Sequence, residues 1–322
     1  MRAIRFATTG GPEVLELVEI DTPAPGPGQI LLRHQAIGIN FIETYQRSGL
    51  YPVKLPATPG GEAAGVVEAV GEGVTRFKVG DRVATTNVAG AYAEAGLVRA
   101  DRAVAIPDAI STEVAAAILL KGMTTEAFIR RAYPVQAGQT VLVHAAVGGV
   151  GQIMTQWLKA IGAVVIATVG SEDKAAKARA LGADHVILYR DQDVAAEVKR
   201  ITDGVGVPVV YDSVGKDTFE GSLASLARRG LMVTFGNASG PVPPFPPARL
   251  AAGGSLFMTR PTLFDYIVTT EELDESAGLV FGMVASGQID IEIGQTFALA
   301  EARKAHEALE SRATVGASLL IP

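Results

Sequence analysis

The stretch VLVHAAVGGVGQIMTQWLKAIGA, residues 141–163, limits the possible folds more than any other part of the chain. An apolar run is followed by small residues at Ala146, Gly148 and Gly151, with Gly149 as an additional glycine. The apolar residues that come next recur at the spacing of one helix face: Ile153, Met154, Trp157, Leu158 and Ile161. The pattern predicts a strand, a tight glycine turn and a helix.

The region from about residue 123 to 260 repeats this alternation of strand and helix. Apolar runs lie at 140–146, 164–170, 185–189, 208–215 and 231–236, and helical segments lie at 151–163, 172–183 and 193–204. Continuous apolar runs are typical of parallel strands buried on both faces. We therefore predict an α/β fold with a doubly wound parallel sheet in this region.

Residues 1 to about 120 have a different pattern. Runs rich in β-forming residues, such as QILLRHQAIGI (29–39) and AAGVVEAV (63–70), are separated by segments rich in Gly and Pro. This pattern predicts a unit built mostly of short strands and turns. Five prolines within residues 241–247 exclude regular structure there, and a strand-like run (255–259) and a helix-rich tail follow.

Length and composition exclude several classes of function. A chain of 322 residues is long enough for two domains. A net charge of −6 and a pI near 5.4 give no electrostatic support for nucleic-acid binding. The absence of cysteine excludes disulfides, thiolate nucleophiles and zinc sites that need sulfur ligands. No apolar run is long enough for a signal peptide or a membrane span, so we expect no membrane association and a cytoplasmic location.

The glycine turn has a chemical meaning if a dinucleotide binds there. Small residues let the backbone approach a pyrophosphate, and the start of the following helix offers unpaired N–H groups to the phosphates. The strand before the turn and the strand and helix after it favour this interpretation. The alternative is a glycine turn that only allows close packing.

The residues after the second strand of this region indicate which dinucleotide is bound. In NAD-binding versions an acidic residue ends this strand and takes the ribose hydroxyls. Here the strand ends in Gly170 and Ser171, Lys174 follows one turn into the next helix, and Tyr189 ends the third strand. This favours NADP(H), whose 2′-phosphate would meet Lys174. The alternative is that Lys174 is a solvated residue at an ordinary helix start.

Seven motifs, in order along the chain, resemble those of one family. They are GINFIETYQRSGLYP (38–52), LKGMTTEAF (120–128), HAAVGGVGQ (144–152), VVYDSVGKDTF (209–219), RRGLMVTFGNASG (228–240), LFMTRPTL (256–263) and ESRATVGASLLIP (310–322). The chain resembles the zinc-independent, zeta-crystallin-like NADPH:quinone oxidoreductases of the medium-chain dehydrogenase/reductase superfamily. The resemblance extends from residue 10 to the last residue.

This resemblance implies a division of the chain into two domains. Residues 1–122 and 263–322 are expected to form a catalytic domain, a partly open β-barrel of the GroES-like type. Residues 123–262 are expected to form the Rossmann domain that binds NADP(H), with the active site at the domain boundary. Relatives commonly form homodimers through the Rossmann sheet edge, which here is the run 231–236 or 255–259.

The chain departs from the zinc-using relatives at the positions of their metal ligands. Those relatives carry Cys in a GIC motif and His in a GHE motif, whereas this chain has GINF, with Asn40, and GGE, with Gly61. Asn and Gly cannot replace a thiolate and an imidazole as zinc ligands. None of the four histidines has ligand spacing to another, and we expect His144 to be packed rather than catalytic.

Zinc acts as a Lewis acid that polarises the substrate carbonyl, so a dehydrogenase without zinc needs an acceptor that is already electronically activated. Quinones and α,β-unsaturated carbonyls meet this condition, because the incoming charge delocalises onto a conjugated oxygen. The resemblance implies catalytic roles for Asn40, Tyr45 and Tyr51, with the amide and the two phenol hydroxyls as donor candidates. Either tyrosine could deliver a proton, and the alternative for Tyr45 is a core residue.

The resemblance also implies a set of cofactor contacts. They are Asn40, Thr124, Gly148, Gly149, Val150, Gly151, Gly170, Ser171, Lys174, Tyr189, Ser213, Phe235, Gly236, Asn237, Ser239, Pro261 and Arg312. Arg312 is expected to reach the 2′-phosphate, and its alternative role is an interdomain salt bridge. The sequence thus predicts an NADPH-dependent quinone reductase. An enal or enone reductase is the second hypothesis, and a non-catalytic NADPH-binding crystallin or nucleic-acid-binding protein is the third.

Overall fold

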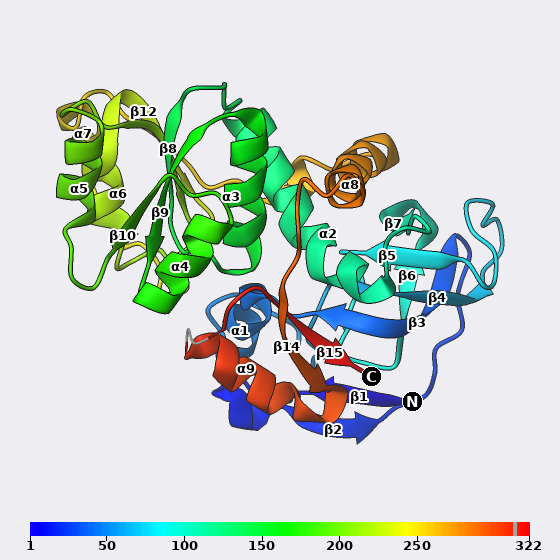
Figure 1. Cartoon of the computed structure of the whole chain (residues 1–322). Helices are drawn as coiled ribbons and strands as arrows, with labels where there is room; N and C mark the ends of the chain where they lie inside the picture. The colour runs from blue at the N-terminus through cyan, green and yellow to red at the C-terminus, as the bar shows by residue number, and fades with distance from the viewer. Residues whose placement is uncertain (312–313) are drawn as a thin grey trace. The chain divides into compact units, whose positions relative to one another are not determined.

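The computed structural model describes residues 1–311 and 314–322. The chain divides into two compact units (Figure 1). Unit 1 consists of Met1–Met123, Ile267–Ser286 and Ile291–Pro322, and unit 2 consists of Thr124–Tyr266 and Gly287–Asp290. The short segment Gly287–Asp290 thus packs with unit 2, although the sequence assigned residues 263–322 as a whole to the first domain.

Unit 1 contains a sheet to which both ends of the chain contribute. Its strand order is β14-β15-β3-β4-β5-β7, and β6 pairs with β3. The strands are β3 (Gln29–Gly38), β4 (Ala63–Val70), β5 (Arg82–Thr85), β6 (Ala95–Arg99), β7 (Ala103–Ala105), β14 (Ile293–Ala298) and β15 (Ala317–Ile321). The C-terminal strand β15 pairs antiparallel with β3, with Leu319 opposite Gly38. A separate hairpin pairs β1 (Arg2–Arg5) with β2 (Glu16–Glu19).

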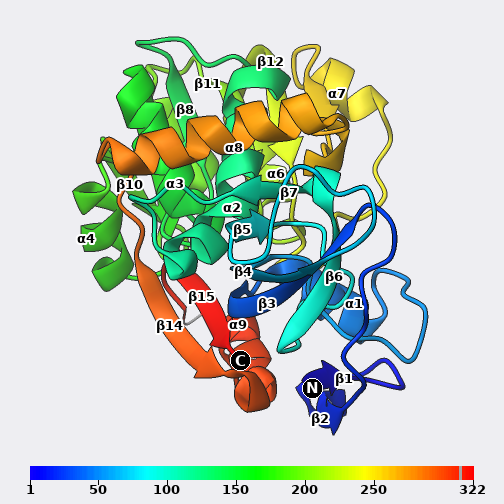
Figure 2. The ribbon, with the colours of Figure 1, turned by 90° about the vertical axis from the view of Figure 1, so that its right-hand side faces the viewer.

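Unit 1 also contains helices that the expectation of short strands and turns did not include. They are α1 (Phe41–Ser48) and most of α2 (Thr112–Glu126), whereas α8 (Thr270–Ala285) and α9 (Ala302–Glu310) belong to the helix-rich tail that the sequence predicted. Helix α8, drawn in orange in Figure 2, packs against β7. Helix α1 begins after Asn40 and ends at Gly49, whose φ of 84° is a left-handed conformation that favours glycine. This short helix carries Tyr45.

Unit 2 is built on a parallel sheet, as predicted. The strand order is β10-β9-β8-β11-β12-β13, and every pair is parallel. The strands are β8 (Thr140–Val143), β9 (Val164–Val169), β10 (His185–Leu188), β11 (Val207–Asp212), β12 (Leu226–Thr234) and β13 (Phe257–Thr259). The order reverses between β8 and β11, the position where ligands bind in sheets of this kind. The run 231–236 lies in and just after the inner strand β12, so of the two expected dimer edges only 255–259, with β13, lies at the edge of this sheet.

Helices cover the sheet of unit 2 (Figure 1). They are α3 (Gly149–Ile161), α4 (Glu172–Ala180), α5 (Val194–Ile201), α6 (Phe219–Ser225) and α7 (Ala248–Ala252). Helix α3 begins at Gly149, two residues before the start expected from the apolar pattern, because the glycines themselves form its first turn. The proline-rich residues 241–247 form no helix or strand, as predicted.

Shorter helical segments connect these elements. They are η1 (Pro12–Val14), η2 (Ala100–Arg102), a π-helical segment η3 (Ala127–Ala132), η4 (Leu263–Asp265) and η5 (Leu299–Glu301). Each unit has its own apolar core, with Ile30, Leu32 and Leu320 fully buried in unit 1 and Leu142, Ile166 and Val210 fully buried in unit 2. No helix among the described residues is both long and apolar enough to cross a membrane.

Candidate functional site

The glycine turn between β8 and α3 is the first part of the candidate site. The backbone folds back at Ala145, whose φ is 51°, and the Gly148 N–H donates to the Ala145 carbonyl oxygen at 3.0 Å. A β-carbon built on Gly151 would lie 2.2 Å from the same oxygen, so only glycine fits there. The N–H groups at the start of α3 have no partner earlier in the helix. This turn has the geometry that holds a pyrophosphate.

The carboxyl ends of β9 and β10 form the second part. Ser171 caps α4, and its Oγ accepts the backbone N–H of Lys174 at 3.4 Å. A β-carbon built on Gly170 would lie 2.6 Å from the hydroxyl oxygen of Tyr189, which follows β10. The structure therefore brings Gly170, Ser171, Lys174 and Tyr189 together, although β9 and β10 are separated by a helix.

Positive charges gather at this point. Partial burial lowers the pKa of Lys174, and the charges of Arg190 and Lys177 lower it further. The Nε atom of Arg190 would lie 3.4 Å from a β-carbon on Gly170. The sequence prediction missed Arg190, although its position directly after Tyr189 was a usable signal. Three cations that interact electrostatically, one of them beside Gly170, fit a phosphate group on the adenosine ribose, so this donor set fits NADP(H).

The loops after β11 and β12 form the third part of the site in unit 2. Gly236 packs directly on Ser213, since a β-carbon on Gly236 would lie 2.0 Å from the Ser213 carbonyl oxygen. The hydroxyl of Ser239 donates to the carbonyl oxygen of Val214 at 2.9 Å. Asn237, between them, is 8% exposed. The structure thus holds Ser213, Gly236, Asn237 and Ser239 in one small region.

A buried polar network supports these loops. The Asp212 carboxylate accepts the N–H groups of Val214 at 2.8 Å and Gly215 at 3.0 Å, and the hydroxyl of Ser222 at 2.7 Å. Ser222 Oγ also lies 3.0 Å from Nε2 of His144. His144 is 2% exposed, and burial lowers its pKa. His144 is therefore a packed residue that supports the loop carrying Ser213.

The remaining cofactor candidates of unit 2 lie near the same loops or in α2. The ring of Phe235 packs edge-on against Phe128, with the ring centres 5.2 Å apart. Arg260, which precedes Pro261, donates from Nη1 to the Gly236 carbonyl oxygen at 3.2 Å. Thr124 is half-buried in α2. Arg312 lies outside the described residues.

In unit 1 the two predicted catalytic tyrosines lie on α1 and just after it. The rings of Tyr45 and Tyr51 meet edge to face with their centres 5.3 Å apart, and the Tyr51 N–H donates to the Tyr45 carbonyl oxygen at 3.0 Å. Phe41 also packs near Tyr45, with the ring centres 6.2 Å apart. Two phenols are thus held side by side, one buried and one half-buried.

Asn40 precedes α1 and contacts ionisable groups that the sequence prediction missed. Its backbone N–H donates to Glu43 Oε2 at 2.6 Å, and its Nδ2 donates to Glu62 Oε2 at 3.0 Å. Lys121 Nζ donates to the same Glu62 oxygen at 2.9 Å. Glu62 is the acid of the GGE motif and Lys121 belongs to LKGMTTEAF, but their separation by 59 residues hid the pairing.

No metal-binding cluster is found in the part of the chain that the structure describes: no three residues of the types His, Cys, Asp and Glu are grouped to hold an ion. The histidines have other surroundings. His306 Nε2 lies 3.1 Å from the Tyr92 hydroxyl and its Nδ1 lies 3.1 Å from Arg47 Nη1. His34 Nδ1 lies 2.8 Å from the carbonyl oxygen of Ala93.

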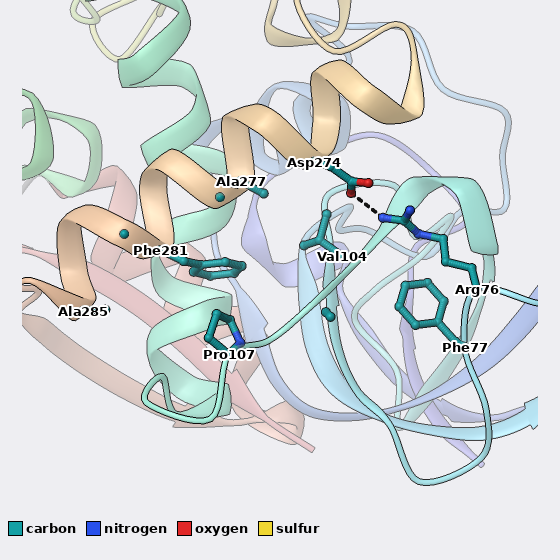
Figure 3. A pocket seen from close by; sticks show the side chains of 11 residues that line it. Arg76, Phe77, Val104, Pro107, Asp274, Ala277, Phe281 and Ala285 are labelled. Carbon is teal, nitrogen blue, oxygen red and sulfur yellow. Dashed lines mark hydrogen bonds and ion pairs between the residues drawn. The ribbon is translucent and has the colours of Figure 1, made fainter.

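Unit 1 also contains a pocket of about 570 Å³ between α8 and the segments around β7 (Figure 3). Its lining residues are Arg76, Phe77, Val104, Ala105, Pro107, Asp274, Ala277, Gly278, Phe281, Gly282 and Ala285. An ion pair joins Arg76 and Asp274 at its edge. None of the predicted site residues that the structure describes lines this pocket.

The geometry and two family matches define the class of protein. Residues 26–108 match the family described as "Alcohol dehydrogenase GroES-like domain", and residues 149–280 match "Zinc-binding dehydrogenase". A GroES-like barrel combined with a Rossmann sheet is the architecture of the medium-chain dehydrogenases/reductases. The fold predicted from the sequence is therefore confirmed.

Full-length relatives identify the family within this class. The quinone oxidoreductase of Pseudomonas aeruginosa is 51% identical, covering 100% of this chain and 99% of the relative. The solved structure of Escherichia coli quinone oxidoreductase complexed with NADPH is 49% identical, with a TM-score of 0.99 and complete coverage of both chains. A 2-haloacrylate reductase of a Burkholderia species is 43% identical over 97% of this chain and 96% of the relative. The chain belongs to the quinone oxidoreductase family, as its motifs indicated.

Proposed function

We propose that this protein is an NADPH-dependent, zinc-independent reductase of quinones. The observation that carries the proposal is the full-length similarity to a quinone oxidoreductase whose structure contains NADPH. The site in unit 2 supports the same cofactor, because Arg190 lies beside the strand end where an NAD-specific site would carry an acid, and Arg190 and Lys177 interact electrostatically with Lys174.

The proposed cofactor contacts follow the three parts of unit 2. The start of α3, from Gly148 to Gly151, would hold the pyrophosphate, and Lys174 with Ser171 and Tyr189 would hold the 2′-phosphate. The nicotinamide side would lie along Ser213, Phe235, Gly236, Asn237, Ser239 and Pro261. Thr124 and Arg312 complete the proposed set.

When bound, NADPH supplies the hydride. The protein's own residues orient the acceptor, exclude water and stabilise the negative charge that develops on the acceptor oxygen. We propose that Tyr45 and Tyr51 provide the hydrogen-bond donor at that oxygen, since their rings are packed together on and after α1. Asn40 is the third residue of this proposed catalytic set. Residues 1–122 and 263–322 would form the substrate-binding domain, and residues 123–262 the cofactor domain.

A second candidate function is the reduction of activated alkenes. The observation that favours it is the 43% identity to a 2-haloacrylate reductase, which covers nearly the whole of both chains. The chemistry is closely related, because a conjugated carbonyl also spreads the incoming charge onto its oxygen. The two functions use the same cofactor and differ only in the substrate that accepts the hydride.

A panel of acceptors separates the candidates. Purified protein is mixed with NADPH and, in turn, with several quinones, 2-alkenals and 2-haloacrylate, and kcat/KM is determined for each from the nicotinamide absorbance. The proposal expects quinones to have the highest kcat/KM. Faster reaction with 2-alkenals or 2-haloacrylate than with every quinone would assign the second function instead.

Two further properties belong to the proposal. We propose a homodimer that pairs through the edge strand β13, whose Phe257 is 59% exposed, and a cytoplasmic location. The net charge of −6 argues against the alternative of a nucleic-acid-binding protein. Sedimentation of the wild type and of Phe257→Lys tests the dimer, since a charge at a paired edge should favour the monomer.

A further inference from the structure

Two buried carboxylates and a buried lysine converge on Asn40. Glu43 and Glu62 are each 1% exposed and Lys121 is 5% exposed, whereas Asn40 itself is half-buried. Burying charged groups is costly unless each has partners. These three buried groups converge on the half-buried amide of Asn40, and we infer that they hold this amide in one orientation.

The contacts of Glu62 determine that orientation. Its Oε1 accepts the Leu120 N–H at 2.7 Å, and its Oε2 accepts from Lys121 Nζ at 2.9 Å and from Asn40 Nδ2 at 3.0 Å. An ionised carboxylate is an acceptor only, so the NH₂ end of the Asn40 amide must face it. The carbonyl oxygen of Gly38 lies 3.5 Å from Asn40 Nδ2 and accepts from it, which favours the same orientation of the amide.

The second carboxylate fits the same arrangement. Burial raises the pKa of Glu43 to about 8, so this group is mostly protonated at neutral pH. Lys121 and Glu62 then form one balanced ion pair in the interior. The backbone N–H of Asn40 donates to Glu43 Oε2 at 2.6 Å at the start of α1, whereas the Asn40 side chain makes no cap hydrogen bond to this helix. The Asn40 amide oxygen lies opposite the NH₂ end that faces Glu62, so its lone pairs are available to a ligand.

We propose that Glu62 and Lys121 are positioning residues that fix Asn40 as a hydrogen-bond acceptor for a hydroxyl or N–H group of the ligand. The inference rests on the proposed function, which places Asn40 at the reacting end of the site. It changes the role expected from the sequence, in which the Asn40 amide was a donor candidate. The donor at the acceptor oxygen is then Tyr45 or Tyr51.

Exchanging the two partners tests this role. Glu62→Gln removes the charge that orients the amide, and we expect kcat with a quinone to fall by about tenfold or more, the value of one well-placed hydrogen bond. The double variant Asn40→Asp/Glu62→Gln exchanges carboxylate and amide. The new amide at position 62 can then donate to the carboxylate at position 40, which again presents an acceptor oxygen, so we expect most of the lost kcat to return.

Binding provides a readout that is independent of turnover. Because Asn40 would contact a part that NADPH and NADH share, Glu62→Gln should change the Kd values of both cofactors by the same factor. Glu68→Gln, which removes a surface partner of Arg33 in the same sheet, is the matched control and should leave kcat unchanged. The melting temperature of each variant checks folding, and Lys121→Arg, which keeps the cation, should retain more activity than Lys121→Met.

Three results would overturn the inference. They are wild-type kcat in a folded Glu62→Gln variant, a double variant no more active than Glu62→Gln alone, and a Kd change confined to NADPH. If Glu62→Gln does not fold, the double variant still decides, because it keeps one carboxylate near Lys121. Failure of the proposed function would differ from all of these, since the wild type itself would not reduce quinones.

Discussion

The hydroxyl of Tyr189 lies against Gly170, so that a β-carbon built on this glycine would be 2.6 Å from it. The contact joins the ends of two neighbouring parallel strands and forms one wall of the proposed adenosine-phosphate site. Lys174 and Arg190 lie at the same place. The choice between NADPH and NADH can therefore be tested there with single substitutions.

We predict that Lys174→Ala weakens NADPH binding by about 1.5 to 3 kcal/mol, the usual value of a hydrogen bond to a charged group, and leaves NADH binding nearly unchanged. Only NADPH carries the 2′-phosphate, so the loss should be selective. Fluorescence titration of both cofactors measures it. Lys78→Ala, on the surface of unit 1, is the control. Equal losses of affinity for NADPH and NADH would contradict the assignment of Lys174 to the 2′-phosphate.

The affinity for NADPH should also depend on pH in the alkaline range, because Lys174 loses its charge there. The lowered pKa of Lys174 means that its positive charge is lost as the pH rises through a value below the ordinary 10.5. NADPH affinity should therefore fall with rising pH earlier than an ordinary lysine would allow, and NADH affinity should not. Because Arg190 contributes to this lowering, Arg190→Ala should move the fall to higher pH. An unchanged pH profile in Arg190→Ala would contradict the proximity of the two cations.

The fold of unit 2 could be predicted from the sequence because its signals are local. Apolar runs, glycines and helical spacing fix β8, α3 and β9, and parallel strand ends meet at one edge of a sheet, so Gly170 and Tyr189 could be placed together. Unit 1 was less predictable. Its short helix α1 has few residues and no long apolar pattern, and the pair of Glu62 and Lys121 joins distant segments that no local pattern connects.

The glycine turn leads to a prediction about both cofactors. Gly151→Ala would place a β-carbon 2.2 Å from the Ala145 carbonyl oxygen, and the turn would have to open. We expect a loss of about 1 to 3 kcal/mol in the free energy of unfolding and weaker binding of NADPH and NADH alike. Gly278→Ala is a matched control, because this helical glycine faces open space and the change should stabilise the helix. Unaltered cofactor binding in Gly151→Ala would contradict the pyrophosphate assignment.

Buried His306 should make stability depend on pH. Burial and the charge of Arg47 lower its pKa to about 3, below the ordinary value of 6.5. Because the pKa is lower in the folded protein, His306 contributes fully to the free energy of unfolding above pH 6.5, and this contribution is lost as the pH falls toward 3. The expected slope is about 1.36 kcal/mol per pH unit for this group.

His306→Gln should remove that slope. Urea unfolding of the variant and the wild type at a series of pH values between about 6 and 4 provides the comparison, because the contributions of the other groups are the same in both proteins. His185→Gln, at an exposed position on β10, should keep the wild-type slope. Parallel curves for His306→Gln and the wild type would show that His306 is protonated in the folded protein.

Metal independence is a separate prediction. The Cys and His ligands of the zinc-using relatives are replaced by residues that cannot bind zinc, so activity should survive exhaustive dialysis against a chelator. Residual metal is measured in the same samples by atomic absorption. Stoichiometric zinc in the purified protein, or loss of activity that added zinc restores, would contradict the prediction.

Quinone-dependent oxidation of NADPH is the most direct test of the proposed activity. The purified, chelator-treated protein is mixed with NADPH and 1,4-benzoquinone, and the nicotinamide absorbance is followed. We expect rapid oxidation of NADPH that depends on both the quinone and the protein concentration, and that is much slower with NADH. Oxidation no faster than the protein-free background, across several quinones, would show that the protein is not a quinone reductase.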